Sequence, residues 1–148
     1  MGAVTYDQDL YSWSLEQAKL LRERKFDQID LEHIIEEIED MSKSEKRALE
    51  SFLETLLMHL LKWQYQPFYI GKRSWKFTII EQRKRITRHL KENPGLKSKL
   101  PEVIDSAYEY AVSGAVRETG LIPETFPETC PWEYEQFIDP EFWPEAAE

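Results

Sequence analysis

Apolar residues recur along this chain at intervals of three and four, which is the spacing of an amphipathic α-helix. The clearest run lies in the first third of the chain, where the apolar positions are Leu31, Ile34, Ile35, Ile38 and Met41. Alternation with a period of two, the pattern of a half-buried strand, never persists. The pattern therefore predicts an all-α protein.

Residues that start and stop helices divide the first half of the chain into three predicted helices. The first follows Thr5 and runs to about Lys25, and the second follows Asp30, a residue type favoured at helix N-caps. Residues 42–45, Ser-Lys-Ser-Glu, form a capping box, so a third helix starts there or the second continues with a bend. This third helix is the most apolar and ends at about Gln64. We expect it to be the central helix of a bundle.

Two further helices are predicted between breaks at residues 67–71, residues 93–95 and Gly120. The fourth helix occupies residues 74–92, with a serine as its N-terminal cap. Pro101 suits the first turn of the fifth helix, and Gly120 suits its C-terminal cap. The fold class is therefore a compact helical bundle of about five helices.

The last part of the chain, residues 121–148, is rich in proline and acidic residues and is punctuated by Phe126, Trp132, Phe137 and Trp143. Disordered segments contain few aromatic residues. We therefore expect this tail to pack on the bundle, with a short helix near residues 131–138. The predicted organisation is one helical domain over residues 1–148, with the bundle at about 6–120 and the wrapping tail at about 121–148.

Length and composition indicate a folded cytoplasmic protein. The chain has 148 residues, of which 41% are hydrophobic and 32% are charged, and a chain of this length can bury a substantial core. Its longest apolar run, residues 56–61, is far shorter than the roughly 20 residues that span a bilayer. The start of the chain lacks the basic and apolar segments of a secretory signal, and Cys130 is the single cysteine. We expect no membrane association and no internal disulfide.

Charge is distributed unevenly along this acidic chain. The net charge of −9 argues against non-specific binding of nucleic acid by the whole surface. Seven acidic residues and no Lys or Arg lie between Asp27 and Asp40, whereas residues 72–91 hold eight basic residues and one acidic residue. Nucleic-acid binding through the basic helix 72–91, with Trp75 and Phe77 stacking on bases, is an alternative function that we expect less.

Four polar residues on apolar helix faces are the candidates for a site. His59 lies among leucines, and Gln82 interrupts an apolar row, so each needs a hydrogen-bond partner inside the protein. Arg83 is charged at any relevant pH and needs a carboxylate wherever it approaches the core. Glu37, at the border of the buried stripe of its helix, can supply it. We predict a buried Glu37–Arg83 ion pair near His59 and Gln82, with a structural role commoner than a catalytic one.

The sequence gives little support for a metal site or for nucleophilic catalysis. His33, Glu37 and Asp40 lie along one side of a helix and are weak candidate metal ligands, but the Glu-x-x-His motif of helical metal sites is absent. Cys130 lies in the acidic tail, where a thiol is a poor nucleophile. We therefore expect no metal and no other cofactor.

Several blocks of sequence, taken together, resemble a known bacterial family. They are residues 10–18, residues 31–40, His59 to Gln64, Arg73 to Trp75, residues 79–83 and Phe126 to Trp132. Their combination resembles the uncharacterised family catalogued as domain of unknown function 29, over about residues 6–143. The resemblance implies a compact helical fold and brings no established activity, cofactor or catalytic residue. The blocks include the residues of a predicted polar cluster: Glu37, His59, Lys62, Trp63, Trp75, Gln82 and Arg83.

The function that best suits these observations is a non-enzymatic protein-interaction or regulatory module. We expect an unknown protein partner or a homodimer, formed through an apolar surface of the helix 42–64 or of the tail. The alternative is a small enzyme or ligand-binding protein with a polar site at Glu37, His59, Gln82 and Arg83.

Overall fold

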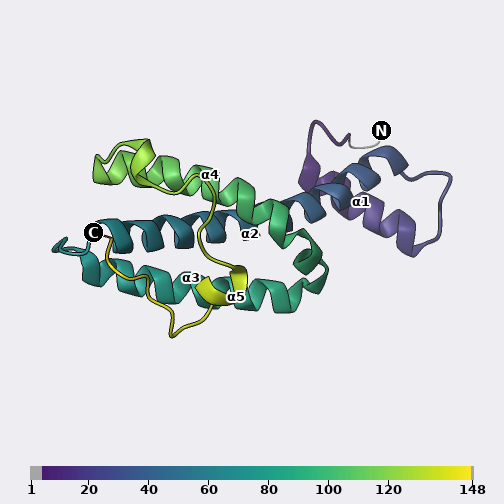
Figure 1. Cartoon of the computed structure of the whole chain (residues 1–148). Helices are drawn as coiled ribbons and strands as arrows, with labels where there is room; N and C mark the ends of the chain where they lie inside the picture. Colours follow the sequence, from purple (N-terminus) through teal and green to yellow (C-terminus); the bar gives the residue numbers. More distant parts are fainter. Residues whose placement is uncertain (1–4, 148) are drawn as a thin grey trace. The chain divides into compact units, whose positions relative to one another are not determined.

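The computed structural model describes residues 5–147, in which the regular elements are helices and no β-strand occurs. The elements in chain order are α1 (Leu10–Arg22), α2 (Leu31–Tyr65), α3 (Lys72–Glu92), the 3₁₀-helix η1 (Pro94–Lys99), α4 (Leu100–Thr119), the 3₁₀-helix η2 (Pro123–Thr125) and α5 (Tyr134–Phe137) (Figure 1). The predicted fold class is therefore confirmed.

Contacts gather the chain into two compact units, Met1–Ser44 and Glu45–Glu148. The boundary falls inside α2, so this helix contributes its first turns to the N-terminal unit and the rest to the C-terminal unit. The single domain that the sequence indicates stays a prediction.

The N-terminal unit is a helical hairpin in which α1 lies beside the first turns of α2. Trp13 and Gln17 are its buried residues. Both are tied to Asp30: the Trp13 indole N–H donates to the Asp30 carboxylate over 3.1 Å, and the Gln17 Oε1 accepts from the Asp30 main-chain N–H over 2.7 Å. Asp9 caps α1 by accepting from the main-chain N–H of Ser12, so the helix start that we predicted directly after Thr5 is wrong.

One continuous helix, α2, stands where we predicted a second and a third helix. Asp30 accepts from the main-chain N–H of His33 over 3.4 Å, as predicted for the start of α2. The capping-box residues 42–45 lie inside α2, which runs unbroken over 35 residues. A capping box stabilises a helix start only where the preceding residues leave the helical conformation. Here the preceding residues stay helical, so α2 continues through the capping box. The count of five α-helices is reached because the tail contains the short helix α5.

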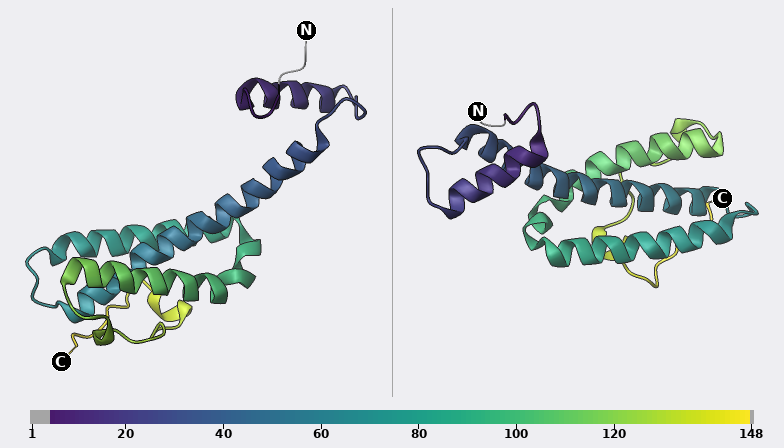
Figure 2. Two further views of the ribbon diagram at one scale, coloured as in Figure 1. Left: turned by 90° about the horizontal axis from the view of Figure 1, so that it is seen from above. Right: turned by 180° about the vertical axis from the view of Figure 1, so that it is seen from behind.

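Three long helices build the C-terminal unit: the later part of α2, α3 and α4 lie side by side (Figure 2). The leucine-rich face of α2 is fully buried, from Leu49 through Leu53 and Leu57 to Leu61. Ile79 and Ile86 from α3, and Val103 and Ala107 from α4, complete the same core. The stretch predicted to be central, residues 42–64, therefore supplies the leucines of this core.

The ends of α3 and α4 lie at or near the helix breaks predicted from the sequence. Lys72 begins α3 after an N-cap at Gly71, so the start that we predicted at Ser74 is two residues late. Pro101 lies in the first turn of α4, as expected. Gly120 ends α4 with a φ of 75°, a left-handed conformation that glycine adopts without steric cost.

The tail packs on the bundle, as its aromatic residues predict. Phe126, Trp132 and Phe137 are buried in the core of the C-terminal unit. The Tyr108 hydroxyl of α4 donates to the Pro127 carbonyl over 2.6 Å, and the Ala147 main-chain N–H donates to Gln64 over 2.9 Å. Among the helices of residues 5–147, none combines the length and the apolar character that crossing a membrane requires.

Candidate functional site

Arg83 holds the tail on α3. Its side chain is 3% exposed. The guanidinium donates to three main-chain carbonyls of the tail, those of Phe137 at 2.9 Å, Pro140 at 3.4 Å and Phe142 at 2.6 Å. It also lies 5.1 Å from the ring centre of Trp143. Carbonyl oxygens, not a carboxylate, therefore satisfy this buried cation.

Glu37 has a different partner, in the N-terminal hairpin. It accepts a hydrogen bond from the hydroxyl of Tyr6, and this bond raises the pKa of Tyr6 to about 12. The Tyr6 ring in turn stacks on His33, with ring centres 4.2 Å apart. The predicted Glu37–Arg83 ion pair is therefore wrong, because each side chain finds its partners in its own unit.

His59 is a half-buried residue of α2. Its Nδ1 lies 2.8 Å from the carbonyl oxygen of Thr55, so the ring donates from this nitrogen. Burial is the main cause that lowers the pKa of His59 below its ordinary value, and the nearby Lys62 cation acts in the same direction. At neutral pH the imidazole is uncharged, and its role as a catalytic base stays an untested prediction.

Lys62, Trp63 and Trp75 form a set of cation–aromatic contacts with their neighbours. The Lys62 ammonium is 4.6 Å from the ring centre of Trp75 and 3.5 Å from the Glu118 carboxylate of α4. Lys72 lies 4.1 Å above Trp63, whose ring packs against Trp143 of the tail at 4.7 Å. These contacts join α2, α3, α4 and the tail, which favours a structural role for this part of the predicted cluster.

Gln82 stands apart from these pairs. Its side-chain oxygen Oε1 is buried and has no hydrogen-bond partner within residues 5–147. The expectation that Gln82 bonds to a group inside the protein is therefore wrong for this atom, and leaving a buried acceptor unpaired costs about 1–3 kcal/mol.

The three weak metal candidates have separate environments. The His33 Nδ1 lies 2.7 Å from the Asp30 carboxylate, Glu37 bonds to Tyr6, and Asp40 is exposed. Within the described chain, no three His, Cys, Asp or Glu side chains gather as a metal site would require. The Asp30 hydrogen bond raises the pKa of His33 and lowers that of Asp30.

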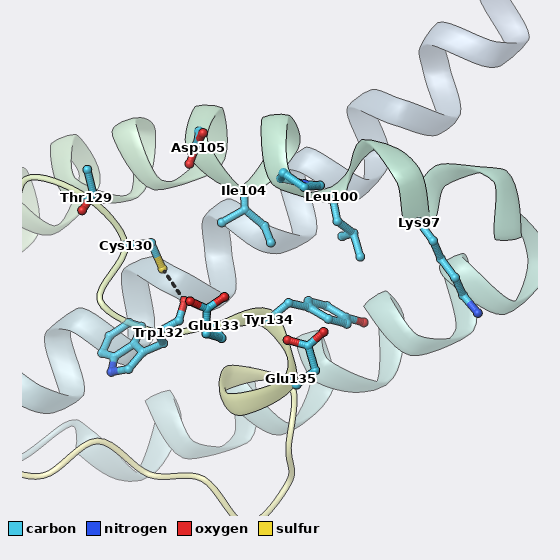
Figure 3. A pocket seen from close by; sticks show the side chains of 11 residues that line it. Lys97, Leu100, Ile104, Asp105, Thr129, Cys130, Trp132, Glu133, Tyr134 and Glu135 are labelled. Atoms are coloured by element: carbon cyan, nitrogen blue, oxygen red, sulfur yellow. Dashed lines mark hydrogen bonds between the residues drawn. The ribbon is translucent and has the colours of Figure 1, made fainter.

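An open pocket lies between α4 and the tail around Cys130 (Figure 3). It has a volume of about 420 Å³, and its wall includes Ile104, Asp105, Trp132 and Tyr134. The thiol donates to the Trp132 carbonyl over 3.4 Å, and burial raises the pKa of Cys130. A thiol of raised pKa is a poor nucleophile, so the pocket carries no reactive group at this position.

The basic helix α3 pairs part of its charge with its own acids. Arg85 bonds to Glu81 at 2.7 Å, and Arg88 bonds to Glu92 at 2.9 Å. Trp75, one of the two aromatic residues predicted to stack on bases, is buried against Tyr69 with ring centres 4.8 Å apart. Stacking by Trp75 is thus excluded in this conformation, and Phe77 alone of the two is exposed.

The largest feature that we did not predict is an apolar surface on the N-terminal hairpin. Eight large apolar side chains of α1 and α2 are 38–75% exposed, and we call them the hairpin face: Leu10, Tyr11, Leu15, Leu21, Leu31, Ile35, Ile38 and Met41. In contrast, the leucines of residues 49–61 are buried. The expected apolar surface on the helix 42–64 is therefore wrong, and the exposed one lies nearer the N-terminus.

The exposed apolar residues of α2 form one stripe, whereas those of α1 are spread around their helix. Successive helical residues turn by about 100°. The four exposed apolar residues of α2 therefore fall within about 120° of one another. On α1, Leu10 and Leu21 lie beside the buried Gln17, whereas Tyr11 and Leu15 lie about 120–160° away from it.

Comparisons with known proteins support the fold and bring no activity. A family model described as "Domain of unknown function DUF29" matches residues 5–143. The crystal structure of an alpha-helical protein of unknown function from Rhodospirillum rubrum is similar to this chain, with a TM-score of 0.63 and 27% sequence identity. The similarity covers 95% of this chain and 93% of that one. No curated protein matches the chain.

Proposed function

The chain belongs to the family "Domain of unknown function DUF29", and we propose that it is a non-enzymatic protein-interaction module that binds its partner through the hairpin face. The observation that carries this proposal is the exposure of eight large apolar residues in a two-helix unit, four of which form one stripe on α2. Contiguous exposed apolar patches of this kind mark sites of association.

The small interior of the hairpin supports the proposal. Trp13 and Gln17 are the buried residues of α1. A unit of about 40 residues without disulfides or metals seldom buries enough apolar surface to be stable by itself. Covering the hairpin face with a partner would supply the missing burial, at roughly 25 cal/mol for each Å² of apolar surface removed from water.

The spacing along α2 indicates which kind of surface fits the hairpin face. Leu31, Ile35, Ile38 and Met41 are separated by four, three and three residues, and this spacing matches the stripes by which helices pack on one another. The partner surface is therefore a pair of helices or an amphipathic helix with a similar apolar stripe. We further propose a cytoplasmic location, which is supported by a single cysteine and an acidic surface charge.

Site-specific photo-crosslinking in the native host tests the proposal. A benzophenone amino acid at position 38 should yield a crosslinked adduct on illumination, because Ile38 lies in the hairpin face. The matched control is position 40, because Asp40 is exposed and lies about 160° away around the same helix. We expect a discrete adduct from position 38 and none from position 40. Equal crosslinking at both positions, or none at position 38, would overturn the proposal.

A further inference from the structure

We infer that the loop between α2 and α3 docks on the surface of a membrane that contains anionic lipids. Its three apolar residues, Phe68, Tyr69 and Ile70, are called the loop tip below. The inference does not depend on the hairpin face, because the loop tip belongs to the C-terminal unit. It is carried by the exposure of the loop tip and by the cations that follow it in the chain.

The loop tip exposes its apolar side chains almost completely. Phe68 and Ile70 are each 97% exposed, and Tyr69 between them is 51% exposed. The Tyr69 ring folds back on Trp75 of α3, with ring centres 4.8 Å apart. Phe68 and Ile70 therefore project from the protein without packing on it. Large apolar side chains exposed together mark a contact with another apolar phase or molecule.

The loop tip lies at one end of the C-terminal unit, together with the end of α4. The Gln66 side-chain amide donates to the carbonyl of Thr119, the last residue of α4, over 3.3 Å. Figure 1 shows the loop and the last turn of α4 at the same end. Ile122, just beyond α4, is 65% exposed. This end of the unit thus presents apolar side chains from two loops.

Cations without acidic partners follow the loop tip. No Asp or Glu occurs in residues 55–80, which contain four Lys or Arg residues. Three of these, Lys72, Arg73 and Lys76, lie in the first turns of α3. Within residues 5–147, none of the three forms an ion pair. Arg73 and Lys76 are also exposed, so their charges are available to an anionic partner.

Acidic residues at this end do not neutralise these cations. Glu118 of α4 pairs with Lys62, over 3.5 Å. Glu145 also belongs to this end, because the main chain of Ala147 bonds to Gln64. It is exposed, and it forms no ion pair with the described residues. It weakens the attraction for an anion without cancelling three positive charges.

The net charge of −9 does not prevent such a contact. Exposed charges farther apart than the Debye length, about 10 Å at 0.1 M salt, are largely screened from each other. Glu135 of the tail, for example, lines a pocket with Thr87. Thr87 is about 22 Å beyond Lys72 along α3. The attraction of the cations for an anionic surface is therefore local.

A lipid surface suits both features better than a protein or a nucleic acid does. A bilayer accepts apolar side chains of any shape, whereas a protein partner needs a pocket for each projecting side chain. Nucleic acid would satisfy the cations but would leave the aliphatic Ile70 in water. Anionic headgroups attract cations beside inserted apolar groups, and tyrosine favours the headgroup level. The lack of a bilayer-long apolar run, from which we expected no membrane association, does not bear on a tip that enters only the interface.

Flotation of the full chain with lipid vesicles tests the inference. We expect binding to vesicles of phosphatidylcholine with about 40% phosphatidylglycerol. Binding to phosphatidylcholine alone should be at least about tenfold weaker, because the cations contribute only on the anionic surface. Binding to the anionic vesicles should also weaken as the salt concentration rises. No binding to either kind of vesicle, or equal binding to both, would overturn the inference.

Substitution of the loop tip separates its contribution from that of the hairpin face. Phe68→Ser with Ile70→Ser should bind anionic vesicles at least about tenfold more weakly, because less apolar surface leaves water. Phe68→Trp should keep its binding, since tryptophan also favours the membrane interface. The matched control is Ile35→Ser with Ile38→Ser, which removes two exposed apolar side chains of the hairpin face and should bind as the unaltered chain does.

Circular dichroism should show equal helix content in these variants, because every substituted position is exposed. If the hairpin variant loses vesicle binding and the loop variant keeps it, the loop tip is not the docking site and the inference is wrong.

Neutralising the cations tests their part. Arg73→Gln with Lys76→Gln should weaken binding to anionic vesicles at least about tenfold. The matched control is Arg85→Gln with Arg88→Gln, which removes the same charge from exposed positions that begin about 18 Å farther along α3. It should bind nearly as tightly as the unaltered chain. Equal losses in the two variants would overturn the inference, and so would a chain that binds a single-stranded oligonucleotide through Arg73 and Lys76 but no vesicle.

Discussion

The guanidinium Nε of Arg83 donates a 2.9 Å hydrogen bond to the main-chain carbonyl of Phe137, which lies 54 residues later in the chain. Its other nitrogens donate to the carbonyls of Pro140 and Phe142. One side chain of α3 thus satisfies three tail carbonyls that would otherwise be short of donors. The tail is held by this cation as well as by its aromatic residues.

Replacing Arg83 with methionine should therefore destabilise the C-terminal unit by about 2–4 kcal/mol, because buried carbonyls lose a charged donor. Urea unfolding followed by circular dichroism measures the loss. The matched control is Arg85→Met, which removes an exposed pair with Glu81 and should cost less than about 1 kcal/mol. Equal losses in the two variants would show that the tail contacts of Arg83 contribute nothing.

Replacing Gln82 with methionine should stabilise the protein by about 1 kcal/mol. The Gln82 Oε1 is buried without a hydrogen-bond partner in the described part of the chain, and an apolar side chain of similar shape removes the cost of desolvating it. The measurement is the midpoint of thermal unfolding, with Glu81→Gln on the exposed side of the helix as the control. A lower midpoint for Gln82→Met would instead reveal a partner bound to this atom.

Replacing Gly120 with alanine should cost about 1–2 kcal/mol, because residue 120 has a φ of 75°, where a Cβ atom is strained. Steric overlap with neighbouring atoms is not the cause, since a Cβ at this position meets no atom within 4 Å. Gly95 is the matched control, because a Cβ there also meets nothing within 4 Å and its φ is not positive. Gly95→Ala should leave the free energy of unfolding nearly unchanged. A similar loss in both variants would contradict the conformational explanation.

The His33–Asp30 pair should make the stability of the hairpin depend on pH. The hydrogen bond that His33 donates to Asp30 raises the pKa of His33 above 6.5, so its contribution is complete below pH 6.5 and is lost as the pH rises through the folded value. The pKa of Asp30 is lowered below 3.8, so its contribution is lost only as the pH falls through that lower value. The pair therefore contributes most between about pH 4 and pH 6.5.

An NMR titration of the His33 ring protons measures this effect. The midpoint should lie above 6.5 in the unaltered chain and should fall in Asp30→Asn, which removes the main cause of the shift. Glu32→Gln, beside the pair and absent from the causes of the shift, is the control and should leave the midpoint in place. An unchanged midpoint in Asp30→Asn would show that other acids near His33, such as Glu36 and Asp7, dominate its pKa.

Local patterns predicted the helices well because helix formation and helix termination are local properties. Apolar spacing located the helices, and the breaks at residues 93–95 and Gly120 ended α3 and α4 where the sequence indicated. The same reasoning misplaced the start of α1 and divided α2 at Ser42, because capping residues mark a helix start only if the chain bends there. The outcome at such a position depends on packing outside the local segment.

The sequence by itself determined the all-α class, the leucine-rich central stretch and the packing of an aromatic tail, since each follows from composition and periodicity. Tertiary structure alone decided the partners of Arg83, because carbonyls 54 to 59 residues away reach it only after the tail has folded back. It also decided that the stripe at residues 49–61 is buried while that at residues 31–41 is exposed. Both stripes have the same spacing, and only the placement of neighbouring helices distinguishes a core from a surface.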